Sequence, residues 1–161
     1  MAKRGRKAWD ESASTAQNAR LRLPPMLRDY FETGRKLMAE ESSAKALHQF
    51  RLDTKRVRYT LELFRPLYGP GLETPLAGLR RIQDYLGAIS DCDTTKDTIA
   101  GALPETAPER GRLAGLLDAR AKRSSAALRK YWRQTFDKPG EERRWTLYLA
   151  RQAGVKRNTA R

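Results

Sequence analysis

Apolar residues recur along most of this chain at the three- and four-residue spacing of an amphipathic helix. The clearest line runs at intervals of 4, 3, 3, 4 and 3 positions through Leu72, Leu76, Leu79, Ile82, Leu86 and Ile89. A similar line within residues 43–68 is formed by Leu47, Phe50, Val57, Leu61 and Phe64. No convincing segment shows the strict alternation of a half-buried strand, so the pattern predicts an all-α protein.

Proline and glycine divide this pattern into five segments. We expect helices over residues 14–40, 43–68, 75–101, 108–136 and 141–153. Gly69, Pro70 and Gly71 follow the second segment and are typical of a helix end. Pro24 and Pro25 fall within the first segment, where they either kink the helix or mark its true start.

These segments predict an antiparallel helical bundle of four long helices plus a short C-terminal helix, joined by short loops. A length of 161 residues favours one domain. We expect residues 10–153 to form the bundle and residues 1–9 and 154–161 to be basic flexible tails.

The net charge of the chain indicates which class of partner it could bind. The chain has 33 Lys and Arg against 19 Asp and Glu, a net charge of +14. This excess favours a polyanion as partner: nucleic acid, an anionic membrane surface or polyphosphate. No stretch approaches the ~20 apolar residues of a membrane span, and no apolar run follows the basic N-terminus as in a secretory signal. We therefore expect a cytoplasmic protein with no membrane partner.

Few residues could perform catalysis or hold a metal. Cys92 and His48 are the only cysteine and histidine of the chain. No phosphate-binding loop, nucleophile elbow or zinc cluster is present, so we expect neither an enzyme nor a bound cofactor or metal. Asp84 and Asp91 share a helix face, and we expect them to pair with Arg or Lys across the bundle. Gly87 costs about 1 kcal/mol relative to Ala within a helix, which predicts close approach of a neighbouring helix.

The positive charge is concentrated in the second and fourth segments, and residues 44–66 and 107–138 together hold 15 of the 33 basic residues. In the second segment, one side carries what we name the first stripe, formed by His48, Arg51, Lys55 and Arg58. In the fourth segment, the second stripe is formed by Arg120, Arg123, Lys130 and Arg133. Like charges at such spacings repel by a few tenths of a kcal/mol per pair, and no carboxylate is expected nearby to relieve this. Side by side, the two stripes would form a basic channel suited to a linear polyanion; the alternative is two solvated faces of ordinary helices.

Two stretches of the chain resemble a known family. Residues 47–64 read LHQFRLDTKRVRYTLELF and residues 79–93 read LRRIQDYLGAISDCD. In order and spacing they resemble the CHAD domain, the conserved histidine α-helical domain. The first family pattern, His-x-x-Arg followed by a basic pair and Arg-Tyr, falls on His48, Arg51, Lys55, Arg56, Arg58 and Tyr59. The second falls on Leu79, Arg80, Ile82, Gln83, Asp84, Leu86, Gly87 and Asp91.

The resemblance implies an all-helical scaffold that binds inorganic polyphosphate through basic residues lining its helices, without enzymatic activity of its own. It also implies association with polyphosphate-metabolising enzymes or with polyphosphate granules. A complete domain of the family has two similar four-helix halves, whereas this sequence has one copy of the His-x-x-Arg pattern and resembles one half. We therefore expect a homodimer in which the second chain restores the missing half.

The candidate polyphosphate site combines both stripes with three further residues of the resemblance. Its members are His48, Arg51, Lys55, Arg56, Arg58, Tyr59, Arg80, Arg120, Arg123, Lys130 and Arg133. Arginine forks match paired phosphate oxygens, and lysine acts as a point charge. Two alternatives stay open: a nucleic-acid-binding protein that uses the same basic surface, and a non-catalytic accessory to a polyphosphate-metabolising enzyme. Few aromatic residues lie among the basic ones, which is unfavourable for stacking of bases.

Overall fold

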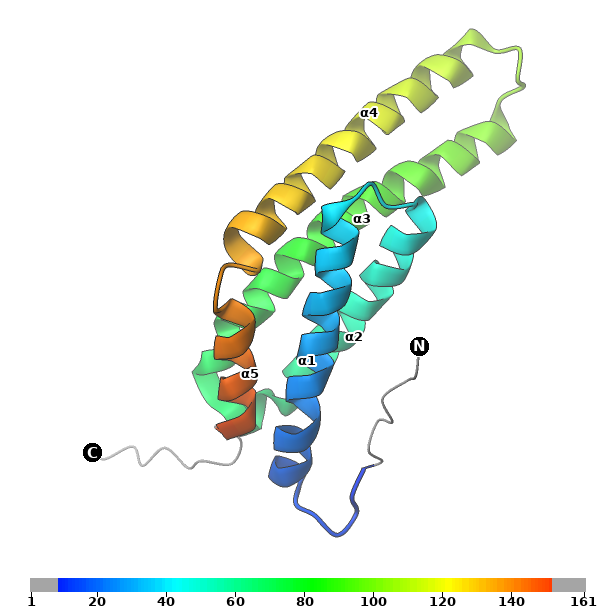
Figure 1. The fold of residues 1–161 in the computed structure, drawn as a ribbon. Coiled ribbons are helices and arrows are strands. Elements are labelled where there is room, and N and C mark those ends of the chain that lie inside the picture. The colour runs from blue at the N-terminus through cyan, green and yellow to red at the C-terminus, as the bar shows by residue number, and fades with distance from the viewer. Residues whose placement is uncertain (1–8, 152–161) are drawn as a thin grey trace.

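The computed structural model describes residues 9–151, and in that range it is an all-α bundle without strands. The long helices are α1 (Thr15–Ala39), α2 (Ala44–Tyr68), α3 (Glu73–Ala102) and α4 (Pro108–Tyr131). A 3-10 turn η1 (Gly69–Leu72) joins α2 to α3, and a π-helical turn η2 (Trp132–Phe136) follows α4. The chain then forms the short helix α5 (Glu141–Arg151). The predicted fold of four long helices plus a short C-terminal helix is confirmed (Figure 1).

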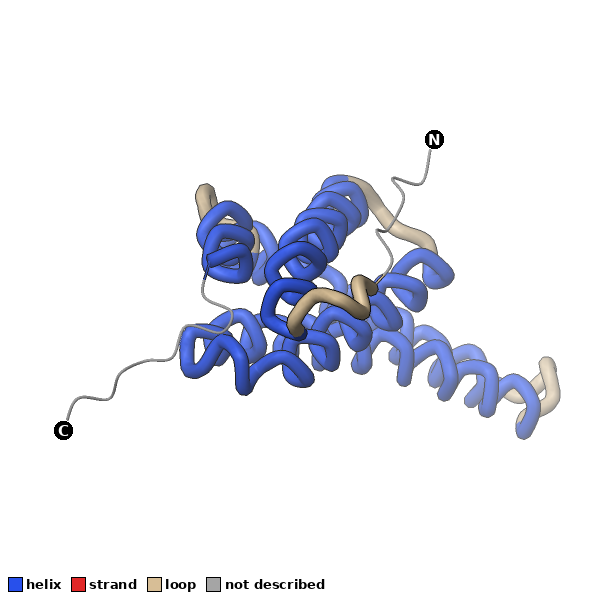
Figure 2. The backbone as a smooth tube through the Cα atoms, turned by 90° about the horizontal axis from the view of Figure 1, so that it is seen from below, coloured by secondary structure: helices blue, strands red, loops and turns tan. Residues whose placement is uncertain are grey.

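The four long helices pack consecutively, and α5 returns to pack on α1. α1 packs on α2 and α5, α2 packs on α3, and α3 forms an extensive interface with α4. The ends of α3 and α4 that meet at residues 103–107 extend beyond α1 and α2 (Figures 1 and 2). The first stripe on α2 and the second stripe on α4 are therefore carried by different helices that flank α3.

Local signals explain where the helices begin and end. Ser14 and Gln17 form a capping box: the Ser14 Oγ accepts from the Gln17 amide, and the Ser14 amide donates to the Gln17 side chain. Ser43 caps α2 in the same way through its hydroxyl. α2 ends at Gly69, whose φ of +71° is readily adopted only by glycine, and α4 starts with Pro108 at its first position.

Pro24 and Pro25 lie inside α1, so of the two alternatives the second is wrong: they do not mark the helix start. A proline has no backbone N–H, so neither residue can donate the usual hydrogen bond to the carbonyl four positions earlier. The helical ladder of α1 is thus interrupted at two successive positions, between residues 15–23 and residues 26–39.

An aromatic cluster fills the centre of the bundle. Tyr30 stacks on Phe50 with ring centroids 5.0 Å apart, and Trp132 lies 4.8 Å from Phe136. The ring of Trp132 packs directly on the backbone of Gly34, where an added Cβ would lie 2.1 Å from the ring. The π-helical turn presents both Trp132 and Phe136 to this core, although the sequence pattern predicted a continuous helix over residues 108–136.

The segment before α1 packs on the bundle. Trp9, which the sequence placed in the N-terminal tail, stacks on Phe64 with ring centroids 6.3 Å apart. The Asp10 amide donates to the Asn18 side chain, and the Asn18 amide group donates back to the Asp10 carbonyl. The predicted tail residues 1–8 and 154–161 lie outside the described residues. No helix within residues 9–151 is long and apolar enough to cross a membrane.

Candidate anion-binding site

The first stripe lies along the side of α2 that faces α3. The Arg58 Nε donates to the Gln83 Oε1 at 2.9 Å, and its Nη1 lies 2.7 Å from the Glu62 Oε1. Arg80 of α3 donates to the same Glu62 oxygen at 3.1 Å. These contacts join the antiparallel helices and fix their register. Glu62 neutralises part of the charge of Arg58 and Arg80. The prediction that no carboxylate lies near this stripe to reduce the repulsion between its cations is therefore wrong.

Continuing this register by one helical turn places Lys55 of α2 opposite Gly87 of α3. A Cβ added at Gly87 would meet no atom within 4 Å. The prediction that Gly87 marks a close helix approach is therefore wrong, and the glycine instead borders open space. We call the surface formed by Arg51, Lys55 and Arg58 of α2 with Arg80, Gln83 and Gly87 of α3 the α2–α3 edge.

Two cations of the α2–α3 edge are partly buried and have no partner among residues 9–151. Arg51 and Lys55 form no hydrogen bond or ion pair there, and the Nε of Arg51 is buried without an acceptor. Buried polar donors are nearly always satisfied in folded proteins. An external acceptor that binds the unpaired guanidinium N–H would therefore form a hydrogen bond that the protein itself lacks. His48 lies farther along the same side of α2, exposed and also without a partner in the described residues.

Arg56 and Tyr59 belong to the outer face of α2 rather than to its α3-facing side. Arg56 is exposed and lies 3.6 Å from Asp53. The Tyr59 ring is 53% exposed, and the Arg58 guanidinium carbon lies 4.3 Å from its centroid. Tyr59 thus holds Arg58 from one side while Gln83 and Glu62 hold it from the other.

The second stripe differs from the first because one of its arginines contacts the main chain of α1. Arg133 donates to the Met38 carbonyl at 2.6 Å, and its neighbour Arg129 donates to the Glu40 carbonyl at 2.9 Å. Both arginines therefore satisfy carbonyls at the C-terminal end of α1, where cations also complement the helix dipole. Arg120 is nine residues from Arg129, which at about 100° per residue puts it on the opposite side of α4, away from α1. One of the four members of the second stripe, Arg133, is thus engaged within the protein, and the channel between the two stripes stays a prediction.

Arg123 and Lys130 complete the second stripe and are exposed. Like Arg120, they form no hydrogen bond or ion pair with any described residue. They match the alternative stated for a basic stripe, a solvated helix face. Of the eleven predicted site residues, the structure brings together Arg51, Lys55, Arg58 and Arg80, with His48 at one end of the edge.

The predicted ion pairs of Asp84 and Asp91 on α3 do not form with any described residue. Asp84 and Asp91 are exposed and form no ion pair with any described residue, so the expected pairing across the bundle is wrong. Asp93 does pair with Lys96, whose ammonium also lies 2.8 Å from Asp118 of α4. The hydrogen bond from Lys96 lowers the pKa of Asp118 and raises that of Lys96 itself. No group of three or more His, Cys, Asp or Glu within residues 9–151 could hold a metal ion.

Sequence reasoning missed the parts of the site that organise its cations. Glu62 follows Arg58 by four residues, a spacing at which opposite charges meet on a helix, so this contact had a visible signal. The role of Gln83 had no such signal, because it depends on the register of α3 against α2. The carbonyl contacts of Arg129 and Arg133 likewise depend on packing between distant segments.

The comparison with family sequence models agrees with this geometry. The model of the CHAD domain matches residues 2–100, more than half of the chain. The chain belongs to the CHAD domain family. The CHAD match includes α1, α2 and nearly all of α3, and hence the whole α2–α3 edge, whereas the second stripe on α4 lies beyond it. Comparisons with curated proteins and with solved structures gave no match.

Proposed function

We propose that the α2–α3 edge binds inorganic polyphosphate. The observation that carries this proposal is the pair of partly buried, unpartnered cations Arg51 and Lys55 opposite the open space at Gly87. A side chain at position 87 would occupy this space, and glycine leaves it open to a ligand. Membership in the CHAD family supports a polyphosphate-related role.

The proposed ligand fits a helix edge because its charges repeat along a line. Successive cations of the first stripe are three or four residues apart, which corresponds to about 4.5–6 Å along a helix. Each phosphate of the polymer carries negative charge and oxygen acceptors, so a run of phosphates can follow Arg58, Lys55, Arg51 and His48 in turn. The net charge of +14 attracts such a polyanion over a longer range.

We propose binding without catalysis and without a resident cofactor. The cations of the α2–α3 edge can hold and orient phosphates, and the nearby carboxylate Glu62 is engaged by Arg58 and Arg80. A protein of this kind would localise, store or present polyphosphate, and could serve as an accessory to an enzyme that metabolises it. We expect a fluorescent fusion to collect at polyphosphate granules in the cytoplasm.

Removal of the two unpartnered cations tests the proposal. Arg51→Gln with Lys55→Gln should weaken polyphosphate binding about ten-fold and reduce the slope of log affinity against log salt by about 0.7 per lost contact. The matched control is Arg120→Gln with Arg123→Gln, which changes the net charge equally on α4. Titration calorimetry at several salt concentrations measures the affinity and its salt dependence for the two variants. Equal losses in the two variants would show diffuse electrostatic attraction and would contradict a site at the α2–α3 edge.

A nucleic-acid partner is the second candidate, and the exposed ring of Tyr59 beside Arg58 is the observation that favours it. An exposed aromatic ring next to cations can stack on a base. Labelled single-stranded DNA bound to the protein should be displaced by long-chain polyphosphate at an equal phosphate concentration. If the DNA stays bound and Tyr59→Ala releases it, the nucleic-acid function is correct and the polyphosphate proposal is wrong.

We also propose that two chains associate. The single His-x-x-Arg copy, at His48 and Arg51, leaves the chain as one half of the two-half architecture that its resemblance implies. Sedimentation velocity at micromolar concentration, with and without polyphosphate, should show a dimer. A strictly monomeric protein that still binds long polyphosphate tightly would contradict this.

A further inference from the structure

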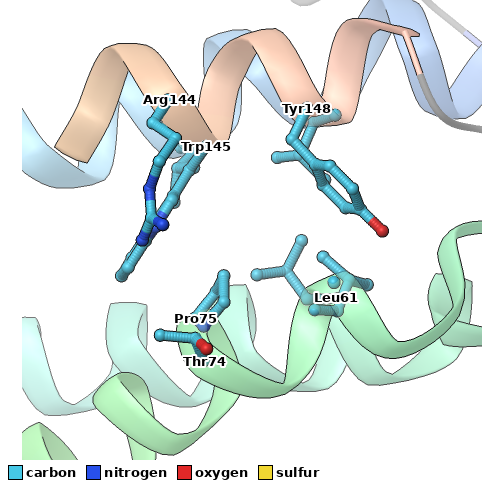
Figure 3. A pocket seen from close by; sticks show the side chains of 10 residues that line it. Leu61, Thr74, Pro75, Arg144, Trp145 and Tyr148 are labelled. Carbon is cyan, nitrogen blue, oxygen red and sulfur yellow. The ribbon is translucent and has the colours of Figure 1, made fainter. Parts of the chain in front are cut away.

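A pocket outside the α2–α3 edge opens between α5 and the junction of α2 with α3 (Figure 3). Its volume is about 330 Å³. The residues that line it include Pro75 and core leucines that are at most 1% exposed, namely Leu27, Leu61, Leu72 and Leu149. Gly71 also borders it, and an added Cβ there would lie 2.2 Å from the Tyr148 hydroxyl.

This volume is large enough for a specific ligand. A dry apolar cavity of about 150 Å³ is already sufficient for benzene, and ligand pockets of proteins start at about 300 Å³. An apolar molecule that enters this pocket would gain dispersion contacts with the side chains that line it.

Polar groups of the pocket residues point to the chemistry of the ligand. Arg144 and Trp145 extend from α5 towards Thr74 and Pro75 (Figure 3). Arg144 donates through one Nη to Glu141, which leaves further N–H groups of its guanidinium available. Trp145 is only 6% exposed, and its indole Nε1 is buried without an acceptor. Thr74 offers an exposed hydroxyl that forms no hydrogen bond within residues 9–151.

We propose that this pocket binds a small apolar carboxylate, of the aryl or medium-chain alkyl type. The apolar body lies among the side chains that line the pocket, which include Pro75 and Tyr148, and the carboxylate accepts hydrogen bonds from Arg144 and from the hydroxyl of Thr74. The buried indole N–H of Trp145 is a third donor for an oxygen of the ligand. The tyrosines at the opposite side are already engaged: Tyr148 donates to the Tyr68 carbonyl, and Tyr68 donates to the Leu149 carbonyl.

Fluorine NMR of the full chain labelled with 5-fluorotryptophan tests the site. Octanoate is the probe and octanol its neutral counterpart, and Trp145→Phe identifies the signal of Trp145. Octanoate should shift this signal alone and leave those of Trp9 and Trp132 unchanged. No shift at about 5 mM octanoate, a concentration at which even millimolar affinity is visible, would overturn the proposal. Equal shifts of all three signals would overturn it as well, because they indicate non-specific association.

Variants at the mouth test the class of ligand. Arg144→Gln should weaken octanoate binding about five-fold, in line with an exposed charge contact, and leave octanol binding unchanged. The matched control Arg143→Gln removes an exposed charge from the adjacent position of α5 and should change the binding of neither octanoate nor octanol. Thr74→Trp should obstruct the mouth and weaken both ligands. Circular dichroism verifies the fold of each variant.

Two results would overturn the carboxylate as occupant. If octanoate and octanol bind equally and Arg144→Gln affects neither, the pocket selects only an apolar body. If the Trp145 signal shifts on dilution of the protein without any ligand, a second copy of the chain fills the pocket.

Discussion

The two basic stripes have similar spacing in the sequence, but the fold uses them differently. On α2, Arg51 and Lys55 have no partner among residues 9–151 and lie beside open space, and Arg58 is oriented by Gln83 and Glu62. In η2, directly after α4, Arg133 donates to a carbonyl at the end of α1, while the members of its stripe on α4 are exposed.

The role of a line of cations therefore cannot be assigned until the residues that face it are known. A cation close to an unpaired main-chain carbonyl contributes to folding, and one close to a gap is available for a ligand. The α2 stripe lies next to a helix that leaves such a gap at Gly87, whereas the C-terminal end of the α4 stripe lies next to a helix terminus that needs donors. Variants that change only one of the two stripes test this contrast.

The largest expected effect concerns the structural end of α4. Gly34→Ala should lower the free energy of unfolding by about 3 kcal/mol, because its Cβ would lie 2.1 Å from the Trp132 ring, which cannot move within the core. Urea unfolding measures this loss. The control is Gly115→Ala on α4, where a Cβ meets nothing within 4 Å and where alanine should stabilise the helix. An equally stable Gly34→Ala variant would contradict the packing of Trp132 of η2 against α1.

The next effect separates the two stripes by filling space beside each. Gly87→Leu should weaken polyphosphate binding about ten-fold, because the side chain would occupy the gap opposite Lys55. Gly115→Leu adds the same side chain on α4, five residues from Arg120, and should leave binding unchanged. Both positions have room for a Cβ, so both variants should fold. Equal affinities in calorimetric titrations of the two variants would refute a site at the α2–α3 edge.

A smaller effect tests the folding role of Arg133. Arg133→Gln removes a charged donor to the Met38 carbonyl and should cost about 1 kcal/mol, or about 3 °C in Tm, without a change in polyphosphate affinity. Lys130→Gln is the control, since Lys130 has no partner among the described residues. Thermal unfolding followed by circular dichroism compares them. If Lys130→Gln lowers Tm as much, the loss reflects net charge rather than the carbonyl contact.

We expect the smallest effect on the free energy of unfolding at alkaline pH, where a tyrosine that contacts α2 can be compared with one on α4. Burial raises the pKa of Tyr30, whose hydroxyl contacts Thr54 of α2, and also that of the less buried Tyr131 on α4. The folded state then keeps phenol protons that the unfolded chain loses above pH ~10, so the free energy of unfolding falls as pH rises. Tyr30→Phe should flatten this fall more than Tyr131→Phe in urea unfolding at pH 8 to 11. The opposite order would place the more strongly perturbed tyrosine on α4.

Most of the fold could be predicted because its signals are local. Ser14 and Ser43 cap the first two helices, Gly69 ends the second, and Pro108 opens the fourth. The π-helical turn at residues 132–136 was missed, because it arises where Trp132 and Phe136 meet the core. Their partners come from α1, α2 and α5, and helical periodicity carries no information about such contacts.

The candidate site could be predicted only along one helix. Spacing placed Arg51, Lys55 and Arg58 on one side of α2, since residues three and four apart lie on the same face. What these cations face depends on the register between α2 and α3, which no local pattern specifies. For the same reason Gly87 was assigned to a close contact, although its missing side chain leaves open space.

The two successive prolines of α1 also affect how this helix opens. Pro24 and Pro25 cannot donate to the carbonyls of Arg20 and Leu21, so fewer hydrogen bonds tie residues 15–23 to the rest of α1 and this part can detach more readily. Amide protons of residues 15–23 should then exchange with solvent at a lower free energy than those of residues 26–39. One continuous helix would thus show two levels of exchange protection, with the lower one set by the contacts of Ser14 and Asn18.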